Sequence, residues 1–483
     1  MGGLFFVPTA HPRRIALLKP GATGRFSVDM ARNLAKLRRK RQGGGKRMNL
    51  TIDEALAQGG AGRFQGRLLG IFGLVWAADA MQVIAIGFTA ASIAASFGLT
   101  VPQALQTGTL FFLGMFAGAT LFGRIADRIG RRNVLFLTVG CDAVFGLASV
   151  FAPDIWSLML LRFLTGMAVG GTLPVDYAMM AEFLPPRNRG RWLVWLEGFW
   201  AVGTIAIALT AWIAHLAGAA EPWRWIFAIA ALPAVIGIWL RLWVPESPMY
   251  LLRKGDEAGA RAVVDRVLTA NGARALPAGT RLTAPPVTAE ARLFGPELRN
   301  RSLGIFAAWF LVSLSYYGVF VWLPAELAKG GFGFVRGYGF LVLMALAQLP
   351  GYALAAHGVE SWGRKPTLQI FLVLSAAGCV LFTVAVSPWL VAASLLLMSF
   401  ALLGTWGALY AFTPELYPTS LRGTGMGTAS AVARVGGLLA PSLMGYVVAR
   451  GFGVAIGVFA ALLLLAALAT LFIRAETRNQ SIV

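Results

Sequence analysis

The sequence contains few of the residues that build metal sites, disulfide frameworks and catalytic clusters. It has two cysteines and three histidines in 483 residues. Cys141 and Cys379 both lie inside apolar stretches, where cysteine acts as a small packing residue. The histidines, His11, His215 and His357, are too few and too scattered for a metal site. These absences argue against a disulfide-stabilised domain, a metal centre and an enzyme with a nucleophile–base pair.

Charged residues are also scarce, at 13% of the chain, while 57% of the residues are hydrophobic. Apolar stretches of about 18 residues or more recur along the sequence, as in membrane-spanning helices. No Gly-x-x-x-x-Gly-Lys-[Ser/Thr] loop is present, which excludes transport driven by a nucleotide bound in such a loop. The sequence therefore predicts an all-α integral membrane protein that is not an enzyme, with no cofactor and no metal.

Positive charge is abundant, with a net charge of +21. Residues 1–47 carry twelve Lys and Arg against one acid, and the remaining excess lies in the loops between apolar stretches. In a membrane protein such loops report topology, so we expect no nucleic-acid partner. The basic tail is expected to be disordered and to rest on anionic lipid. The alternative is that the tail has no role and that translation begins at Met48.

The apolar stretches predict twelve transmembrane helices in two sets of six. Their approximate ranges are 68–96, 102–124, 133–151, 157–184, 192–217, 222–244, 301–328, 334–357, 366–386, 388–413, 424–449 and 452–474. The predicted organisation is a basic tail at 1–47, a lead-in at 48–67, an N-terminal bundle at 68–244, a central loop at 245–300, a C-terminal bundle at 301–474 and a tail at 475–483. Apolar residues at helical spacing within 255–271 predict an amphipathic helix lying against the membrane or the basic loops.

Lys and Arg are concentrated in alternate connections between the predicted spans, for example at Arg128, Arg187, Lys254 and Arg364. The opposite connections hold little charge. The positive-inside rule then places both termini and the central loop in the cytoplasm. We expect a multi-pass protein of the plasma (inner) membrane.

The chain repeats its motifs with a constant offset of 233 residues. A first motif contains Glu182, Pro185 and Arg189, and returns as Glu415, Pro418 and Arg422. A second motif contains Asp127 and Gly130, and returns as Glu360 and Gly363. Two unrelated motifs in the same register indicate two halves built on one plan.

Read together, these motifs resemble the major facilitator superfamily over nearly the whole chain beyond Leu50. The residues that carry the resemblance to its sugar-porter branch are Gly123, Asp127-Arg128, Gly130-Arg131-Arg132, Arg162, Gly166, Gly170, Glu182, Arg189-Gly190-Arg191 and Pro245-Glu246-Ser247-Pro248. Within that branch, Trp76-Ala77-Ala78-Asp79, Leu173-Pro174-Val175-Asp176 and Glu197-Gly198-Phe199-Trp200 look like niacin permeases, synaptic-vesicle glycoproteins and organic-ion carriers. Gln82 departs from the pattern, because relatives of this type carry an acid there.

Acids and arginines of the repeated loop motifs are predicted to form a cytoplasmic latch. Carboxylate–guanidinium bonds would hold the cytoplasmic helix ends together and would break when the transporter opens inward. The candidate residues are Asp127, Arg131, Glu182, Arg189, Glu360, Arg364, Glu415 and Arg422. The alternative is that these are ordinary solvated loop charges.

Charges inside membrane spans are costly and commonly functional. Asp79 lies in the first span, one turn from Trp76, where the low dielectric favours the neutral acid. Arg162 in the fourth span is the natural cation, and the family resemblance implies such an acid–arginine couple for proton coupling. Arg162 is placed about 10 Å nearer the outer face at 1.5 Å rise per residue, so the pair is expected to meet in one state only. The alternative is that Asp79 is a structural, hydrogen-bonded acid.

Arg434 in the eleventh span is the main clue to the substrate. Organic-anion carriers resemble this chain in placing an arginine there, and a guanidinium facing a cavity offers a forked donor to a carboxylate. The alternative is a permanent ion pair of Arg434 with Glu197 or Asp142. Further candidate substrate contacts are Trp76, Asp176, Glu197, Tyr316, Tyr317 and Gln348, with Tyr177, Trp200, Trp406 and Tyr410 as additional aromatic candidates.

The predicted function is proton-coupled uptake of a small organic anion by alternating access. An aromatic or heterocyclic monocarboxylate such as nicotinate is the expected substrate, with the proton as coupling ion. One alternative is a proton-coupled symporter of a sugar or other neutral metabolite, although the spans hold few Asn and Gln for a polyol. A second is a non-transporting receptor on a transporter scaffold. The expected partners are a small-molecule substrate and the lipid bilayer, and the chain is expected to be a monomer.

Overall fold

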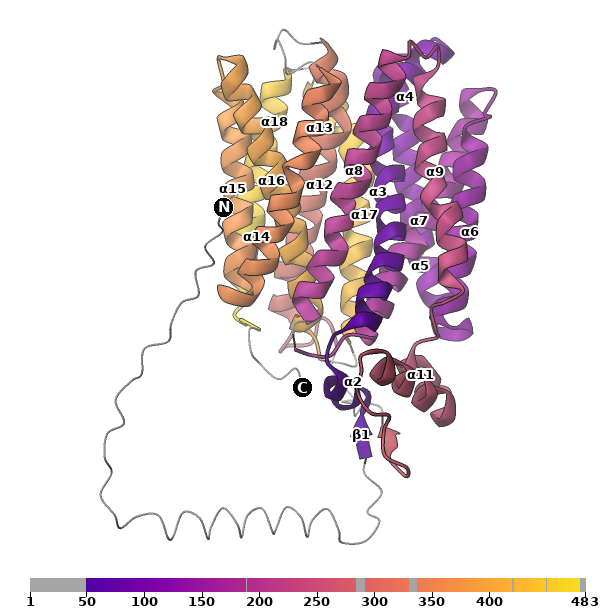
Figure 1. Ribbon diagram of the computed structural model, residues 1–483. Helices are drawn as coiled ribbons and strands as arrows, with labels where there is room; N and C mark the ends of the chain where they lie inside the picture. The colour runs from indigo at the N-terminus through magenta and orange to yellow at the C-terminus, as the bar shows by residue number, and fades with distance from the viewer. Residues whose placement is uncertain are drawn as a thin grey trace, which may run out of the picture. The chain divides into compact units, whose positions relative to one another are not determined.

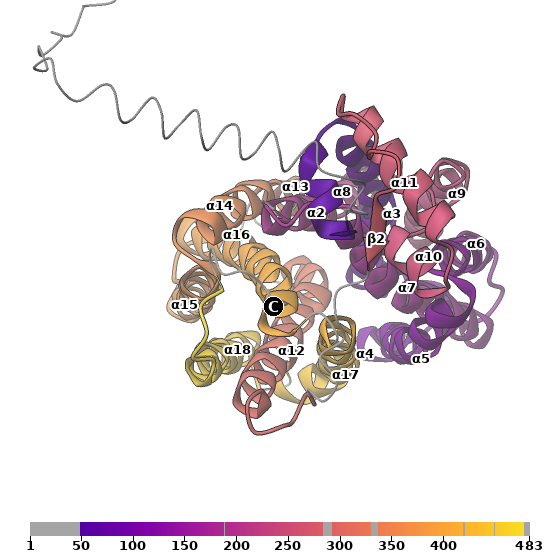
Figure 2. The same cartoon turned by 90° about the horizontal axis from the view of Figure 1, so that it is seen from below.

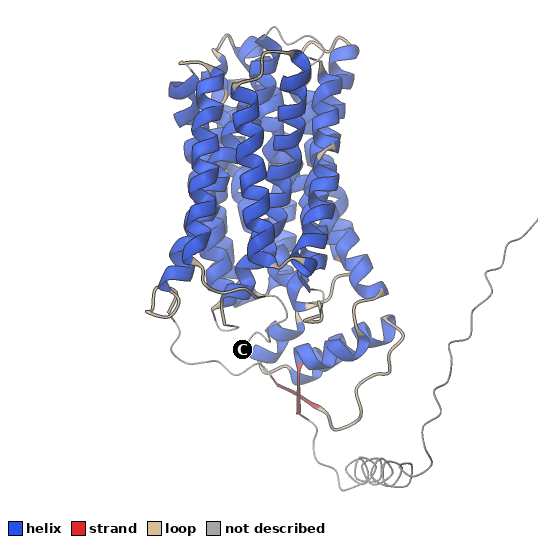
Figure 3. Ribbon diagram, turned by 90° about the vertical axis from the view of Figure 1, so that its left-hand side faces the viewer, coloured by secondary structure: helices blue, strands red, loops and turns tan. Residues whose placement is uncertain are grey.

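Long helices that lie side by side make up most of the chain (Figures 1 and 3). The computed structural model describes residues 49–187, 189–283, 292–329, 337–418, 421–448 and 450–477. In this part of the chain, ten helices are long and apolar enough to span a membrane, and the apolar stretch 222–235 is shorter. The predicted all-α membrane fold is confirmed.

The N-terminal half contributes six spans. They are α3 (Arg63–Phe97), α5 (Gln106–Ile129) preceded by the short α4 (Val101–Ala104), α6 (Arg131–Ser149), α7 (Ile155–Glu182), α8 (Arg189–Leu216) and α9 (Pro222–Arg241). Asp154 caps α7 by accepting hydrogen bonds from the backbone N–H groups of Trp156 and Ser157. Helices α5 and α7 pack so closely that a Cβ atom at Gly118 or Gly166 would overlap a carbonyl oxygen of the facing helix, and only glycine leaves room there.

The C-terminal half contributes the other six spans. They are α12 (Arg299–Lys329), α13 (Tyr338–Leu346) followed by α14 (Gln348–Ser361), α15 (Arg364–Thr383), α16 (Pro388–Phe412) with the 3₁₀ turn η2 (Thr413–Leu416), α17 (Arg422–Val448) and α18 (Phe452–Ala469) with the 3₁₀ turn η3 (Thr470–Phe472). The eighth span is broken at Ala347 between α13 and α14. Figure 2 shows the helices of the two halves gathered into two groups.

Contacts inside the two halves repeat with the offset found in the sequence. A Cβ at Gly118 would overlap the carbonyl oxygen of Met167, and one at Gly351 would overlap that of Phe400. Each member of the second pair follows its counterpart by 233 residues. The exposed tryptophans Trp156 and Trp389, at the first turns of α7 and α16, keep the same offset. The two bundles are therefore pseudo-symmetric, and their exposed tryptophans suit a membrane interface.

Short elements lie at one end of the long helices, called the α11 end below (Figure 1). They are the strand β1 (Asn49–Thr51), α2 (Ile52–Gly59), α10 (Pro248–Arg253), α11 (Glu257–Ala270) and the strand β2 (Arg281–Thr283), which pairs with β1. Thr51 and Glu54 form a capping box at the start of α2. The backbone N–H of Thr51 donates to the carboxylate of Glu54, and so does its hydroxyl. These two hydrogen bonds, mainly that of the backbone, hold the pKa of Glu54 below its usual value.

The central-loop helix α11 forms where the sequence predicts one. Its apolar residues Ala260, Val264 and Leu268 pack against Ala55 of α2, so the amphipathic face is covered by the lead-in helix. Asn271, just after α11, donates to the backbone oxygen of Gly60 at 2.9 Å. Contact of this helix with the membrane or the basic loops stays a prediction, and the structure adds its packing against α2.

Candidate functional site

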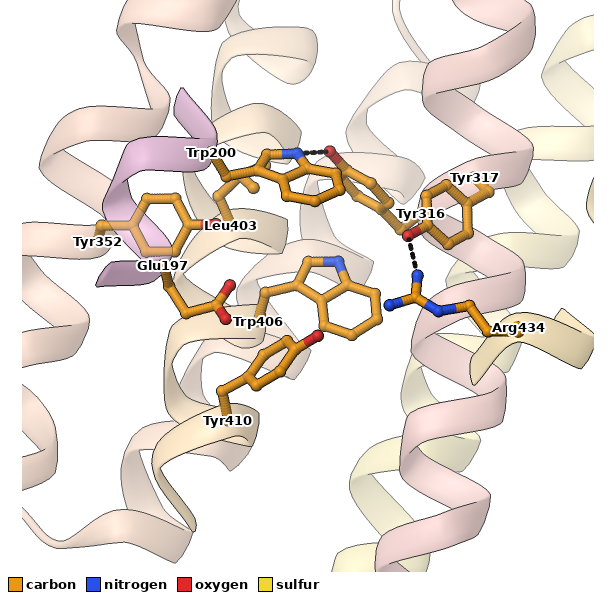
Figure 4. Close-up of a pocket in the computed structure, with 9 residues that line it drawn as sticks. All are labelled: Glu197, Trp200, Tyr316, Tyr317, Tyr352, Leu403, Trp406, Tyr410 and Arg434. Carbon is orange, nitrogen blue, oxygen red and sulfur yellow. Dashed lines mark hydrogen bonds between the residues drawn. The ribbon is translucent and has the colours of Figure 1, made fainter. Parts of the chain in front are cut away.

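A cavity lies between the two bundles, with about 290 Å³ of empty space when the open solvent at its mouth is included (Figure 4). Helices from both halves supply its walls. The lining residues are Glu197 and Trp200 from α8, Tyr316 and Tyr317 from α12, Tyr352 from α14, Leu403, Trp406 and Tyr410 from α16, and Arg434 from α17. Six of these nine side chains are aromatic, so the cavity offers large apolar faces beside two charged groups.

The two charged groups, Glu197 and Arg434, lie on opposite sides of the cavity (Figure 4). Their exposed fractions are 2% and 3%, and their charges interact across the space without forming an ion pair within 4.0 Å. Arg434 donates from Nη1 to the hydroxyl of Tyr317 at 3.2 Å. Among the described residues, Nε of Arg434 and Oε1 of Glu197 have no hydrogen-bond partner. Buried polar atoms nearly always have partners, so these two atoms mark places where a ligand can bind.

Aromatic residues hold the cavity in shape and connect the two bundles. The indole Nε1 of Trp200 donates to the hydroxyl of Tyr316 at 2.9 Å, which joins α8 to α12 (Figure 4). Trp406 packs edge-on against Tyr316, with ring centroids 5.8 Å apart. The Nε1 atom of Trp406 has no hydrogen-bond partner among the described residues. The indole therefore adds a third polar atom that is available to a ligand.

A second aromatic cluster lies between the cavity and the α11 end. It consists of Trp76 and Tyr177 from the first half and their repeat counterparts Trp309 and Tyr410 from the second. The hydroxyl of Tyr177 donates to the backbone oxygen of Tyr410 at 2.9 Å, across the two bundles. The two residues of one repeat position, Tyr177 and Tyr410, thus meet where the bundles face each other.

The repeated loop motifs form ion pairs at the α11 end. Arg131 binds Glu182 at 3.0 Å. Arg364, its repeat counterpart, binds Glu415 at 2.8 Å and Glu360 at 3.4 Å. Each of these pairs joins elements of one bundle.

The remaining predicted latch residues have other surroundings. Arg189 bonds to Asp53 of α2 at 2.8 Å and to the backbone oxygen of Leu184. A Cβ at Gly190 would lie 3.3 Å from both Arg364 Nη2 and Glu360 Oε1, so the start of α8 contacts the other bundle there. The predicted latch residues Asp127 and Arg422 have side chains outside the described part of the chain.

Arg162 is buried within the N-terminal bundle, away from the residues that line the cavity. It donates to the side-chain oxygen of Gln82 at 2.8 Å and to the backbone oxygen of Gln82 at 3.0 Å. The carboxylate whose charge acts on Arg162 is that of Asp142. Asp79 is buried one turn before Gln82 on α3. The proton-coupling role of Asp79 and Arg162 remains a prediction.

The other predicted substrate contacts divide into two groups. Glu197, Tyr316, Tyr317 and Arg434 line the cavity together. Trp76, Asp176 and Gln348 are buried but are not among its lining residues.

Tyr352 and Leu403 line the cavity although the sequence analysis did not select them. Neither carries a charge or belongs to a recognised motif. Helical spacing from Gln348 to Tyr352 and from Leu403 to Trp406 is the only signal that points to them.

A family model described as "Sugar (and other) transporter" matches residues 98–483. The chain belongs to this family. The resemblance to the sugar-porter branch of the major facilitator superfamily is thereby confirmed. The protein is a multi-pass membrane transporter for a small-molecule substrate.

Individual relatives cover most of the chain. A protein of Bacillus subtilis (strain 168) described as "Putative niacin/nicotinamide transporter NiaP" is 36% identical over 417 residues, which span 86% of this chain and 97% of the relative. The niacin transporter NiaP of Acinetobacter baylyi is 34% identical over 430 residues, which span 87% of this chain and 96% of the relative. Among solved structures, the proton:xylose symporter XylE from E. coli superimposes with a TM-score of 0.71 at 18% identity, covering 86% of this chain and 97% of XylE. That similarity shows the shared fold.

Proposed function

We propose that this transporter takes up a small aromatic or heterocyclic monocarboxylate, such as nicotinate, together with a proton. The observation that carries the proposal is the buried Arg434 on the wall of an aromatic cavity, with Nε free of any partner among the described residues. A guanidinium in this setting can donate two parallel hydrogen bonds to a carboxylate. The ring of the ligand would pack between the tyrosines and tryptophans of the walls.

Glu197 would bind the opposite end of the ligand. It faces Arg434 across the cavity, so a bound molecule would place its carboxylate near one group and its far edge near the other (Figure 4). A deprotonated Glu197 accepts from a donor on the ligand, and a protonated Glu197 donates to a ring nitrogen. A pyridine carboxylate carries a carboxylate for Arg434 and a ring nitrogen for Glu197 on one small ring. The name of the Acinetobacter relative, a niacin transporter, supports this substrate class.

A neutral sugar fits the cavity less well. Polyols are bound through many neutral hydrogen-bonding side chains, and the lining residues include neither Asn nor Gln. Gln348, the buried amide that the sequence analysis selected, is not among them.

For the topology, we propose that the α11 end is cytoplasmic and that the protein lies in the plasma membrane. Basic residues such as Arg131, Arg189 and Arg364 gather at that end, in agreement with the positive-inside rule. The ion pairs there would act as the latch that breaks when the cavity opens inward. The family resemblance implies an acid–arginine couple for proton coupling, with Arg162 as its cation. Asp79 is the acid predicted from the sequence, and Asp142 is the acid whose charge acts on Arg162 in the structure.

Transport into proteoliposomes under an imposed proton gradient tests the proposal. Labelled nicotinate should accumulate above its external concentration, and collapsing the gradient should release it. Nicotinamide, which replaces the carboxylate with a neutral amide, is the matched control and should compete at least tenfold less well. Accumulation of xylose in place of nicotinate, or equal competition by nicotinamide, would contradict the anion assignment.

A further inference from the structure

The surroundings of Arg162 form a closed, charged cluster in the N-terminal bundle. Arg162 is 1% exposed and Asp142 is 2% exposed. The guanidinium lies between two aromatic rings, 4.7 Å from the centroid of Phe111 and 4.5 Å from that of Phe227. Such a site keeps the arginine charged and fixed in place, because two ring faces and two hydrogen bonds to Gln82 surround it.

The family pattern would place an acid at position 82 on α3, and the charge of Asp142 on α6 acts on this arginine. Gln82 supplies a neutral amide there, so the negative charge that balances Arg162 comes from α6. The side chain of Gln82 interacts with the carboxylate of Asp142. A Cβ at Gly146 would lie 2.6 Å from Nε2 of Gln82 and 3.6 Å from Oδ1 of Asp142, so both atoms border the same small space.

We propose that Asp142 is the residue that carries the coupling proton, with Arg162 as its fixed counter-charge. An oxygen of the carboxylate accepts a proton from water on the side of the membrane opposite the α11 end. On that side α6 ends at Ser149, seven residues after Asp142, which is about 10 Å at 1.5 Å per residue. The proton leaves to water on the other side after the bundles have moved. Arg162 stays protonated throughout, so the cluster alternates between net neutral and net positive.

The groups around Asp142 agree with this role. Helix α7 contributes Arg162, α3 contributes the neutral Gln82, and Cys141 is the neighbour on α6 whose thiol interacts with the carboxylate. Helix α9 contributes Phe227 to the arginine and Ala231 near Gly146. Protonation of Asp142 removes its attraction to Arg162, so α6 and α7 can change how they pack while Arg162 keeps its hydrogen bonds to Gln82.

This inference rests on the proposed proton coupling, so one readout must not depend on the substrate. Infrared difference spectra of the purified protein between acidic and alkaline buffer report protonation of a buried carboxyl group directly. The carboxyl band should be lost in Asp142→Asn and kept in Asp79→Asn, which tests the rival acid that the family resemblance implies. A band that survives in Asp142→Asn would overturn the proposal, whether or not nicotinate is transported.

Transport provides the second readout, with nicotinate as probe. Asp142→Asn should lose uphill accumulation by at least tenfold, while exchange of nicotinate across the membrane stays within about twofold of the parent protein. Adding Gln82→Asp to Asp142→Asn returns a carboxylate to Arg162 from the other side and should restore accumulation. Full accumulation by Asp142→Asn, or its loss in Asp79→Asn alone, would contradict the assignment. Absence of nicotinate exchange in the parent protein would contradict only the proposed function.

Discussion

The two halves of the molecule share one plan, and each buries an arginine, but the two arginines have opposite surroundings. Arg162 in the first half is surrounded by Gln82, two aromatic rings and the charge of Asp142. Arg434 in the second half donates to the hydroxyl of Tyr317, has no partner for its Nε among the described residues, and lines the cavity between the bundles. A cation whose donors are satisfied by the protein stabilises its own bundle, and one with a free donor can bind a ligand. We therefore propose that Arg162 serves the stability and coupling of its own bundle, and that Arg434 serves substrate recognition.

The largest expected effect is on stability, at Arg162. In Arg162→Gln the carboxylate of Asp142 loses its counter-charge in an apolar interior, and removing one partner of a buried pair costs about 3–5 kcal/mol. Thermal unfolding of the purified protein, followed by tryptophan fluorescence, should show a clear fall in Tm. The double variant Arg162→Gln with Asp142→Asn removes both charges and should recover much of the loss. An equal fall in Tm in the single and double variants would show that the charge of Asp142 does not depend on Arg162, which contradicts the role given to this arginine.

Arg434→Gln should weaken binding with little change in stability. Hydrogen bonds to a charged group contribute about 1.5–3 kcal/mol, which corresponds to roughly a 10- to 150-fold rise in Kd for nicotinate. Titration calorimetry measures the affinity, and Tm of the same preparation measures stability. Arg434→Lys keeps the positive charge but loses the forked pair of donors, so its Kd should lie between those of the parent protein and Arg434→Gln. An unchanged Kd in Arg434→Gln would exclude the carboxylate-binding role.

Glu197→Gln should have a smaller effect that depends on the ligand. The substitution keeps the size of the side chain and removes its charge, so a hydrogen bond to the far edge of the ligand changes by about 1 kcal/mol, roughly fivefold in Kd. Nicotinate, with a ring nitrogen, should feel this change. Benzoate, which lacks the nitrogen but keeps the carboxylate, should bind equally to both proteins. Identical effects on the two ligands would place Glu197 outside the recognition of the ring.

The smallest expected effect concerns the contact between the halves. Tyr177→Phe removes the hydrogen bond to the backbone oxygen of Tyr410, at about 0.5–1.5 kcal/mol. Amide hydrogen exchange in the α11-side thirds of α7 and α16 should become faster, because the bundles separate there more easily. Tyr410→Phe keeps the accepting carbonyl and is the matched control. Equal exchange in both variants would show that the hydroxyl of Tyr177 does not hold the bundles together.

Much of the fold and part of the site could be predicted from the residues alone. The number of spans and the repeat follow from the hydropathy of each segment and from motif register, which are local properties of the chain. The pairs Arg131–Glu182 and Arg364–Glu415 join residues of the motifs that defined the repeat. Arg434 was recognisable because a charge inside a span is rare and costly.

Side-chain partners between helices could not be predicted in the same way. The charges inside the spans and the family resemblance predict Asp79 and Arg162 as a pair. The rotation of α3 and α6 about their axes decides that Gln82 bonds to this arginine and that the charge of Asp142 acts on it. Tyr352 enters the cavity for a similar reason, since the orientation of α14 directs it there.

The sequence by itself determined that this chain crosses the membrane as two related bundles, because each span must be apolar along its own length. Only the tertiary structure decided which buried charge meets which partner and which faces the cavity. Those contacts depend on how each helix is turned against its neighbours, and that is settled by packing across the whole bundle.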